Sequence, residues 1–367
     1  MQAVSLKTLV FVVIIFFFAS NLSGSFLPVY YKEDIRLTMA EIVEILLFTF
    51  IVIGLLPLLL LKFVKNFEKI ISFGIFFTML FFIILIYTKN PIFLGLAYGL
   101  SIATFWPSYN LLQFRLSESR IRARTVSLFS SIIPSLASIA GPAVGGFIIS
   151  NFDFQSLFLV SVILYLTAFL FSMRIKFRPE THEFSIPKMK AFTIFFSTFI
   201  FLGLSEAYWV AYPLFVHTLS ETIFQMGLVL ALSAVLICLV TFLVNWLSDI
   251  KKARAEFAIA GAALSALWYF AISSASTMYQ IVALSPLSGL AGAFSLSWFA
   301  HYGDSFSREH YASILVMMEA GLMVGRIINL APTYIFISKA DYASYFMLLG
   351  VVSLFLIPFF IASKKRK

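Results

Sequence analysis

Three ionisable residues lie inside long apolar stretches of the sequence. Glu206 lies within the stretch at 191–215, and Glu319 and Arg326 lie within the stretch at 311–337. A charged side chain in the hydrocarbon core of a membrane costs about 3 kcal/mol or more, so such residues are candidates for function. A helix would place Glu319 and Arg326 two turns apart on one face. We expect Glu206 and Arg326 to pair and Glu319 to take up and release a proton. The alternative is a structural ion-pair cluster that fixes helix packing.

Polar and aromatic side chains recur at helical spacing in four of the apolar stretches. Asn21 and Ser25 are one turn apart in the first stretch, and Trp106 and Asn110 are one turn apart in the fourth. Such stripes suit a cavity for an amphipathic solute, although helix packing or an interfacial belt would explain any single Ser or Trp. The side chains expected to line the cavity are Asn21, Ser25, Trp106, Asn110, Glu206, Trp209, Tyr212 and Trp298.

The sequence offers little for other kinds of chemistry. His301, Asp304 and His310 resemble a metal site in composition, but their spacing matches no helical face, so a solvated loop is the better interpretation. Cys238 is the single cysteine, which excludes a disulfide within the chain and a metal site made of cysteines. The phosphate-binding loop of ATPases has no counterpart in the sequence. We therefore expect no metal and no cofactor.

The elements that position these residues must be membrane-spanning helices. Hydrophobic residues make up 61% of the chain and charged residues only 12%, whereas about 25% of residues are charged in a typical soluble domain. A helix needs roughly 20 apolar residues to cross the hydrocarbon core, and continuous apolar runs favour helices over barrel strands. The predicted spans are 8–29, 39–61, 69–88, 91–113, 125–150, 154–175, 191–215, 222–247, 255–273, 278–300, 311–337 and 341–363.

Lys and Arg residues fall on alternate connections between these twelve spans. If the N-terminus is cytoplasmic, 21 of the 26 Lys and Arg residues lie on the cytoplasmic side and four lie on the outer side. This asymmetry predicts a multi-pass protein of the cell (plasma) membrane with both termini in the cytoplasm. It also accounts for the net charge of +9 without a nucleic-acid partner, and membrane lipid is the expected surrounding.

The chain divides into two similar halves. The polar segment 176–190 contains two prolines and is expected to be a cytoplasmic linker. Pro28 matches Pro213 at an offset of 185 residues, and the tetrapeptide at Ser117 matches the tetrapeptide at Ser305 at an offset of 188. The nearly equal offsets favour a duplication of a six-helix unit. The expected domains are an N-terminal six-helix bundle at 1–175, the linker, and a C-terminal six-helix bundle at 191–367.

The helix number, the repeat and the central linker resemble the major facilitator superfamily over the whole chain. One local motif adds to this resemblance. Gly141-Pro142-Ala-Val-Gly145-Gly146 is similar to a motif of antiporters and exporters in that family. It implies a tight, bent contact of helix five that seals the outer side. A packing motif without directional meaning is the alternative.

A second motif lies after helix eight. Asp249 followed by Lys251, Lys252 and Arg254 resembles a family motif that implies a conformational latch, and an ordinary basic loop is the alternative. The position of the Asp in the first half is occupied by Val64, so we expect a latch only in the second half.

The resemblance implies an all-α fold of two six-helix pseudo-repeats and a secondary active transporter of a small-molecule solute. Helices one, four, seven and ten would line the cavity, protons are a candidate coupling ion, and the motif in helix five favours export or antiport. Proton-coupled family members often carry an Arg four residues before a Gly in helix four, where this chain has Gly95 before Gly99. We expect no enzyme activity and a monomer. A membrane-embedded lipid-modifying enzyme and a non-transporting sensor or assembly protein are the alternatives.

Overall fold

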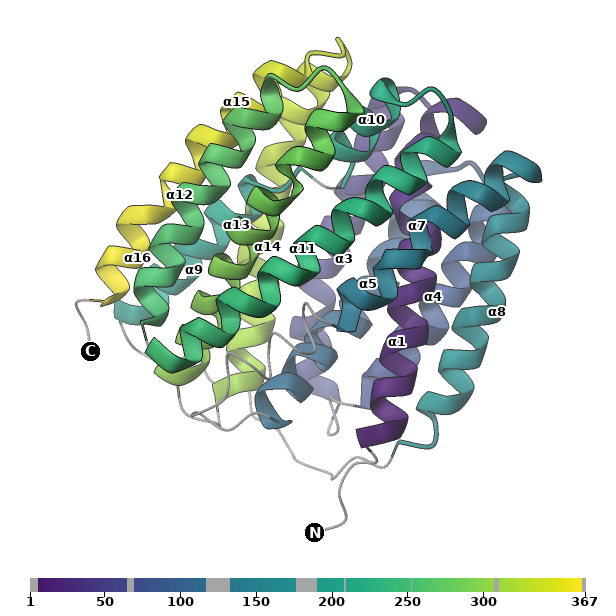
Figure 1. Cartoon of the computed structure of the whole chain (residues 1–367). Helices are drawn as coiled ribbons and strands as arrows, with labels where there is room; N and C mark the ends of the chain where they lie inside the picture. Colours follow the sequence, from purple (N-terminus) through teal and green to yellow (C-terminus); the bar gives the residue numbers. More distant parts are fainter. Residues whose placement is uncertain are drawn as a thin grey trace.

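The computed structural model describes residues 6–64, 69–116, 133–175, 190–207, 209–251, 253–306 and 310–364. Every regular element within these ranges is helical. Helices of the first half, purple to blue-teal in Figure 1, lie mostly on one side of the molecule, and helices of the second half, teal-green to yellow, lie mostly on the other. The all-α fold that the sequence predicts is confirmed.

The described helices form twelve segments, six in each half. The first span combines one long helix with three short elements, and five single helices complete the first half: α1 (Leu6–Ser23), η1 (Gly24–Phe26), α2 (Leu27–Val29), η2 (Tyr30–Asp34), α3 (Met39–Phe63), α4 (Ile70–Tyr87), α5 (Pro91–Leu116), α7 (Ile133–Asn151) and α8 (Phe154–Ser172). The second half contains α9 (Lys190–Leu204), α10 (Ala211–Leu219), α11 (Ile223–Lys251), α12 (Arg254–Ser273), α13 (Met278–Ser305), α14 (Tyr311–Ile337), α15 (Tyr342–Leu354) and α16 (Leu356–Lys364).

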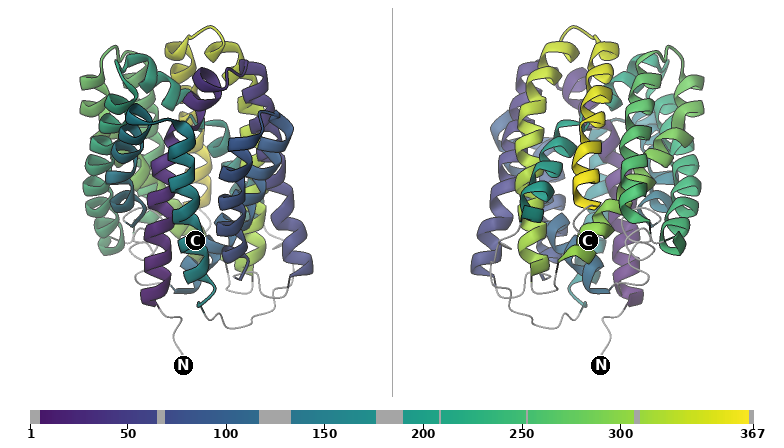
Figure 2. Two further views of the ribbon diagram at one scale, coloured as in Figure 1. Left: turned by 90° about the vertical axis from the view of Figure 1, so that its right-hand side faces the viewer. Right: turned by 90° about the vertical axis from the view of Figure 1, so that its left-hand side faces the viewer.

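The segments run between two faces of the bundle (Figure 2). The terminus face carries the start of α1 and the end of α16, and the far face carries the end of η2 and the start of α3. Several helices that start at the far face have a side-chain cap, because the first N–H groups of a helix lack partners within it. The capping residues are Thr38, Asp153, Thr277 and Asp341. The backbone N–H of Ser156 donates to Asp153 and lowers the pKa of that carboxyl group.

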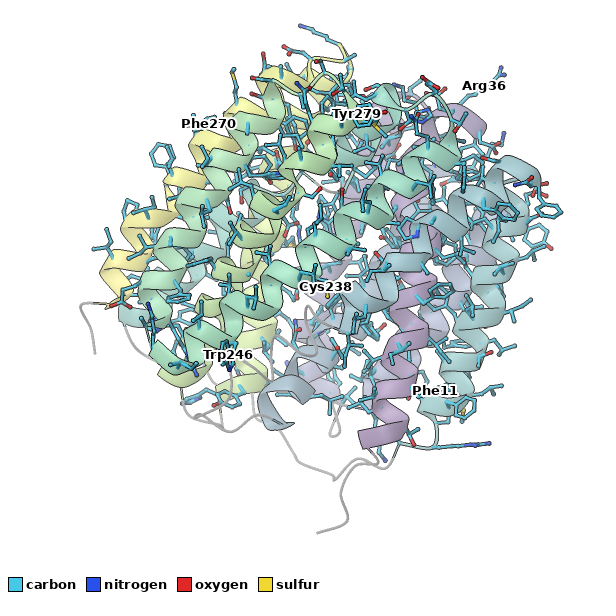
Figure 3. The ribbon with its side chains drawn as sticks, viewed as in Figure 1. Phe11, Arg36, Cys238, Trp246, Phe270 and Tyr279 are labelled. Carbon is cyan, nitrogen blue, oxygen red and sulfur yellow. The ribbon has the colours of Figure 1, made fainter. Side chains whose placement is uncertain are left out.

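The outside of the bundle is suited to lipid. Within the described ranges, eight segments are long and apolar enough to cross a membrane. Large apolar side chains such as Phe11, Trp246 and Phe270 are 44%, 47% and 38% exposed, and they lie on the outer surface in Figure 3. Exposed apolar side chains spread over a whole surface are unfavourable in water and natural in a bilayer. The chain is therefore a multi-pass membrane protein.

One predicted span differs from the observed structure in a way that matters for function. The stretch 191–215 was expected to form one helix, but α9 ends at Leu204 and α10 begins at Ala211. Two side chains from other helices satisfy carbonyl groups that the break leaves without helical partners. The Tyr269 hydroxyl of α12 donates to the carbonyl of Ser205, and the Asn329 amide of α14 donates to the carbonyl of Glu206 at 2.8 Å.

Other boundaries differ less. The first span continues through η2 to Asp34 instead of ending at residue 29, and the last span divides into α15 and α16 at Phe355. The predicted fifth span begins at residue 125, but residues 117–132 lie outside the described ranges, so only its part from Ile133 is observed. These differences change no assignment of a helix to a half.

The two halves meet chiefly along two pairs of helices, and α5 makes a smaller contact with α14. α3 packs against α14, and α7 packs against α11. At the far face α2 also contacts α10. Between these seams the halves leave a cavity.

Candidate functional site

A cavity of about 630 Å³ lies between the two halves. Its wall includes the side chains of Asn21, Ser25, Trp106, Asn110, Trp209 and Tyr212, all of which the sequence analysis expected there. Trp298 lies in α13, but its side chain is outside the described part of the structure. Aromatic rings form much of the remaining wall, including Phe16, Phe17, Phe82, Tyr98, Phe105 and Tyr165.

The helices around the cavity differ in part from those that the resemblance implied. The first, fourth and seventh spans contribute as expected, but none of the described α13 side chains is in the wall. The eleventh span contributes instead, through Met318, Glu319, Leu322 and Arg326 of α14. Helix α14 reaches the cavity because it packs directly against α3 of the other half.

Glu206 does not line this cavity, contrary to expectation. It lies in the break between α9 and α10, beside a narrow space enclosed by Phe50, Trp209 and Arg326 among others. Its side chain is turned toward α14 by a pair of contacts with Arg326, from Nε to Oε2 at 2.7 Å and from Nη2 to Oε1 at 3.0 Å. The Trp209 indole N–H also donates to Oε2 at 2.6 Å. Arg326 therefore holds the Glu206 side chain away from the cavity.

The ion pair expected between Glu206 and Arg326 is present, and it is largely buried. The side chains of Arg326 and Glu206 are 8% and 16% exposed. A bidentate arrangement of guanidinium and carboxylate combines charge attraction with two directional hydrogen bonds. The rings of Phe50 and Trp209 lie 5.8 and 5.3 Å from the guanidinium carbon of Arg326, so its faces are covered by aromatic groups.

Glu319 lies on the other side of Arg326 and faces the cavity. Its Oε2 is 3.7 Å from Nη1 of Arg326, which is longer than a good charged hydrogen bond. The Glu319 side chain is only 6% exposed. The three groups therefore form one chain of charges, from Glu206 through Arg326 to Glu319, in which Glu319 has the weaker contact.

The structure adds residues to this cluster that the sequence analysis missed. Asn329, one turn after Arg326, accepts a hydrogen bond from the Tyr345 hydroxyl at 3.2 Å, and that hydroxyl lies 3.0 Å from the hydroxyl of Thr333. Asn329 and Thr333 continue the polar stripe of Arg326 at helical spacing, so the sequence contained a signal for them. Phe50 comes from α3 of the other half, and nothing in its sequence context indicates this contact.

Tyr31 is a further residue that the sequence analysis missed. It lines the cavity near the far face, is 4% exposed, and its hydroxyl has no hydrogen-bond partner in the structure. A buried hydroxyl without a partner is unfavourable and uncommon. The residue borders the cavity, and its hydroxyl group itself is buried.

The glycine motif of the fifth span, in α7, contacts two different helices. Gly145 packs against α1, where a Cβ atom would collide with the carbonyl of Leu22. Gly146 faces α11 of the other half, where a Cβ atom would lie 2.9 Å from the carbonyl oxygen of Ile223. Gly141 approaches α1 as well, and the carbonyl of Pro142 closely approaches Gly227 of α11. The motif thus joins α7 to both of its neighbours near the far face.

The motif after the eighth span, between α11 and α12, is only partly described. Lys251 is exposed at the end of α11, and Arg254 is buried at the start of α12. The Asp249 side chain and Lys252 lie outside the described part of the structure. The latch that the sequence predicts stays a prediction.

The interpretation of His301 as part of a solvated loop was wrong. His301 lies within α13 and is 5% exposed. Helix α13 continues to Ser305, so the chain is still helical at His301. Among the described residues no three His, Cys, Asp or Glu side chains group as metal ligands.

Comparisons with known proteins agree with this architecture. The family model of the Major Facilitator Superfamily matches residues 9–191 and again residues 194–367. Among solved structures, the E. coli fucose:proton symporter FucP is similar with a TM-score of 0.69 and 14% sequence identity, covering 98% of each chain. No curated protein matches the sequence. At this identity the structural likeness describes the fold, whereas the family match covers both halves. The chain belongs to the Major Facilitator Superfamily.

Proposed function

We propose that this protein is a secondary active transporter that binds a small solute in the central cavity and moves it by alternating access. The observation that carries the proposal is the charged cluster of Glu206, Arg326 and Glu319, which lies where the two halves meet and borders the cavity. Transporters with two related halves bind their solutes between those halves, near the middle of the membrane. Membership of the family supports secondary transport.

Glu319 is proposed to couple transport to protons. It is a nearly buried carboxyl group in the cavity wall with one weak charged contact. Because opening the cavity to one face or the other changes the solvation of this group, it can bind a proton in one state and release it in the other. The similar E. coli protein is a proton symporter, and this lends support to protons as the coupling ion.

Export by antiport is the proposed direction, on the basis of the glycine motif in α7. Gly146 and Pro142 meet α11 across the seam between the halves, near the far face. We propose that this contact closes the far face, which would be the outer side. With Lys and Arg concentrated on the connections of the terminus face, both termini would lie in the cytoplasm and the protein would lie in the plasma membrane as a monomer.

The test begins with a search for the solute. The purified protein is heated with members of a solute panel, because a ligand that binds the folded state raises the melting temperature. Each solute that stabilises the protein is then assayed in proteoliposomes with an imposed pH gradient. Solute movement driven by that gradient is the expected result. Absence of solute movement for every stabilising ligand would contradict the proposal.

Glu319→Gln tests the coupling residue. The variant keeps the shape of the side chain but cannot exchange a proton, so we expect transport driven by a pH gradient to be lost. Binding of a solute that does not depend on the negative charge of Glu319 should persist. Glu44→Gln is the matched control, because Glu44 lies in α3 outside the cavity wall. Normal gradient-driven transport by Glu319→Gln would remove Glu319 as the coupling site.

A further inference from the structure

We propose, building on the transport function proposed above, that the solute is an aromatic or otherwise apolar organic cation with one positive charge, which exchanges for one proton at Glu319. Four observations lead to this class: the charge balance of the cluster, the engagement of Arg326, the aromatic wall, and the unpartnered hydroxyl of Tyr31.

The charge balance of the cluster favours a cation. Among the described side chains of the cavity wall, Glu319 and Arg326 are the ones with a formal charge. Arg326 is already neutralised by Glu206 through two short contacts. When Glu319 is ionised, the cluster of two carboxylates and one guanidinium carries one excess negative charge. A proton or a monovalent cation balances that charge, and an anionic solute would double it.

Arg326 is poorly placed to bind an anion. Its Nε and Nη2 groups donate to Glu206, its Nη1 faces Glu319, and its faces lie beside Phe50 and Trp209. A carboxylate or phosphate on the solute would have to displace a buried ion pair to reach it, which is costly. Glu319 is therefore the group in the cavity wall that attracts a cation.

The aromatic part of the cavity wall suits an apolar cation. Phe17 and Trp106 lie with their ring centroids 5.7 Å apart, and Tyr98 and Trp209 lie 6.1 Å apart. All four border the cavity. Ring faces attract cations, and flat aromatic surfaces bury an apolar body without leaving polar groups unpaired.

Tyr31 adds a neutral polar contact to the cavity. Its buried hydroxyl has no partner, so a solute with one hydrogen-bonding group would satisfy it once the side chain turns toward the cavity. Tyr31 lies in η2 near the far face, whereas Glu319 lies in the interior of α14. The preferred solute is then a cation with its charge at one end and a hydrogen-bonding group at the other.

The exchange step is balanced in charge and in atoms. The protonated Glu319 carboxyl group releases its proton to water, and the cation then pairs with the carboxylate. The charged groups around Glu319 are Arg326 of α14 and Glu206 of the break between α9 and α10. Other elements present only tyrosine hydroxyls as titratable groups to the described cavity wall, namely Tyr31, Tyr98, Tyr165 and Tyr212. One cation exchanged for one proton moves no net charge across the membrane.

Binding to the purified full-length protein tests the solute class. The probes are N-methyl-phenylpyridinium, methylbiphenyl and biphenylcarboxylate, which share a two-ring body and differ in charge. We expect the cation to bind at least about tenfold more tightly than the other two, which corresponds to the energy of one modest charge interaction. In weakly buffered solution, at pH values where Glu319 of the unbound protein is protonated, binding of the cation should release one proton per molecule bound. In the same pH range, binding should weaken by about tenfold per unit of pH decrease.

Two variants assign the binding to the cluster. Glu319→Gln should weaken cation binding by about tenfold or more and abolish proton release, whereas Glu44→Gln should change neither. Glu206→Gln should reduce the ratio of cation affinity to the affinities of the neutral and anionic probes, because Arg326 then neutralises the charge of Glu319. Proton release by the unaltered protein needs no variant, so the proposal stays testable if a variant does not fold.

Transport in proteoliposomes separates this inference from the function on which it rests. Movement of the cation should follow the pH gradient and stay unchanged when a potassium diffusion potential is imposed with valinomycin. Equal binding of the neutral or anionic probe, no binding of the cation, or transport that responds to the potential would overturn the cation class. If another solute from the panel then moves with the pH gradient, only the cation class fails. If no stabilising solute moves, the transport function fails with it.

Discussion

At the scale of single residues, one guanidinium organises the site. Arg326 binds Glu206 by two contacts, lies 3.7 Å from Glu319, and is covered by Trp209 and Phe50. Removing one partner of a buried ion pair leaves an uncompensated charge, which is far more costly than replacing the pair as a whole. Arg326 has two carboxylates beside it, so its loss should be the most damaging single change in the cluster.

This argument predicts an order of stabilities. Arg326→Gln should lower the free energy of unfolding by about 3–5 kcal/mol, because Glu206 and Glu319 are left together without a cation. Glu206→Gln should cost less, because Arg326 still has Glu319. The double variant Glu206→Gln/Arg326→Gln should be more stable than Arg326→Gln alone. Unfolding by titration with SDS in lipid–detergent micelles measures these differences, and equal stability of all variants would show that the pair contributes nothing.

At the scale of elements, close contact between α9 and α14 positions the charged cluster. A Cβ atom on Gly325 would collide with the carbonyl of Ile200, and one on Gly203 would lie 3.1 Å from the backbone nitrogen of Arg326. Small residues let two helix backbones approach each other within a membrane. The break after Leu204 then brings the carboxylate of Glu206 directly to Arg326.

Gly325→Ala tests this contact. The added methyl group has no space, so we expect a loss of about 1–3 kcal/mol in the free energy of unfolding and weaker solute binding, because the Glu206 contact shifts. Gly292→Ala is the matched control, since no atom lies within 4 Å of a Cβ atom there. The control should be neutral or stabilising by up to about 1 kcal/mol. The same measured change for both variants would contradict close packing at Gly325.

At the scale of the whole molecule, the seams between the halves decide which face is closed. Gly146 of α7 and Gly227 of α11 lie at one seam near the far face, and α2 contacts α10 at the same face. A cavity that alternates between faces must open these contacts during the cycle. A change confined to the seam should therefore alter access to the cavity more than it alters the fold.

Gly146→Leu is expected to open the far face. The larger side chain would overpack the closed seam at a cost of about 1–3 kcal/mol, which raises the population of the far-open state by about 5- to 150-fold. The readout is the rate at which a membrane-impermeant maleimide, added from the far side, labels Ser25→Cys in the cavity. Val144→Leu is the control, because the Val144 side chain is 39% exposed. Unchanged labelling in Gly146→Leu would argue against closure at this seam.

The proposed orientation can be tested by cysteine labelling in intact cells. Cys238 is buried and is first replaced by Ser. Asn90→Cys lies at the far face and should react with an impermeant maleimide, whereas Lys69→Cys lies at the terminus face and should react only after permeabilisation. The expectation follows from the concentration of Lys and Arg on one side. Reaction of both cysteines in intact cells, or of Lys69→Cys alone, would refute it.

The sequence by itself determined that lipid surrounds the chain, how many spans there are, and which charged residues are candidates for function. Hydrophobicity over about 20 residues records whether a segment can cross a bilayer, and the cost of burying charge singles out Glu206, Glu319 and Arg326. Only the tertiary structure decided where these groups point. Glu206 lies behind the cavity because α9 breaks before it, and α14 enters the cavity wall because it packs against α3. Both outcomes depend on contacts between residues far apart in the chain, and spacing along a single helix contains no information about them.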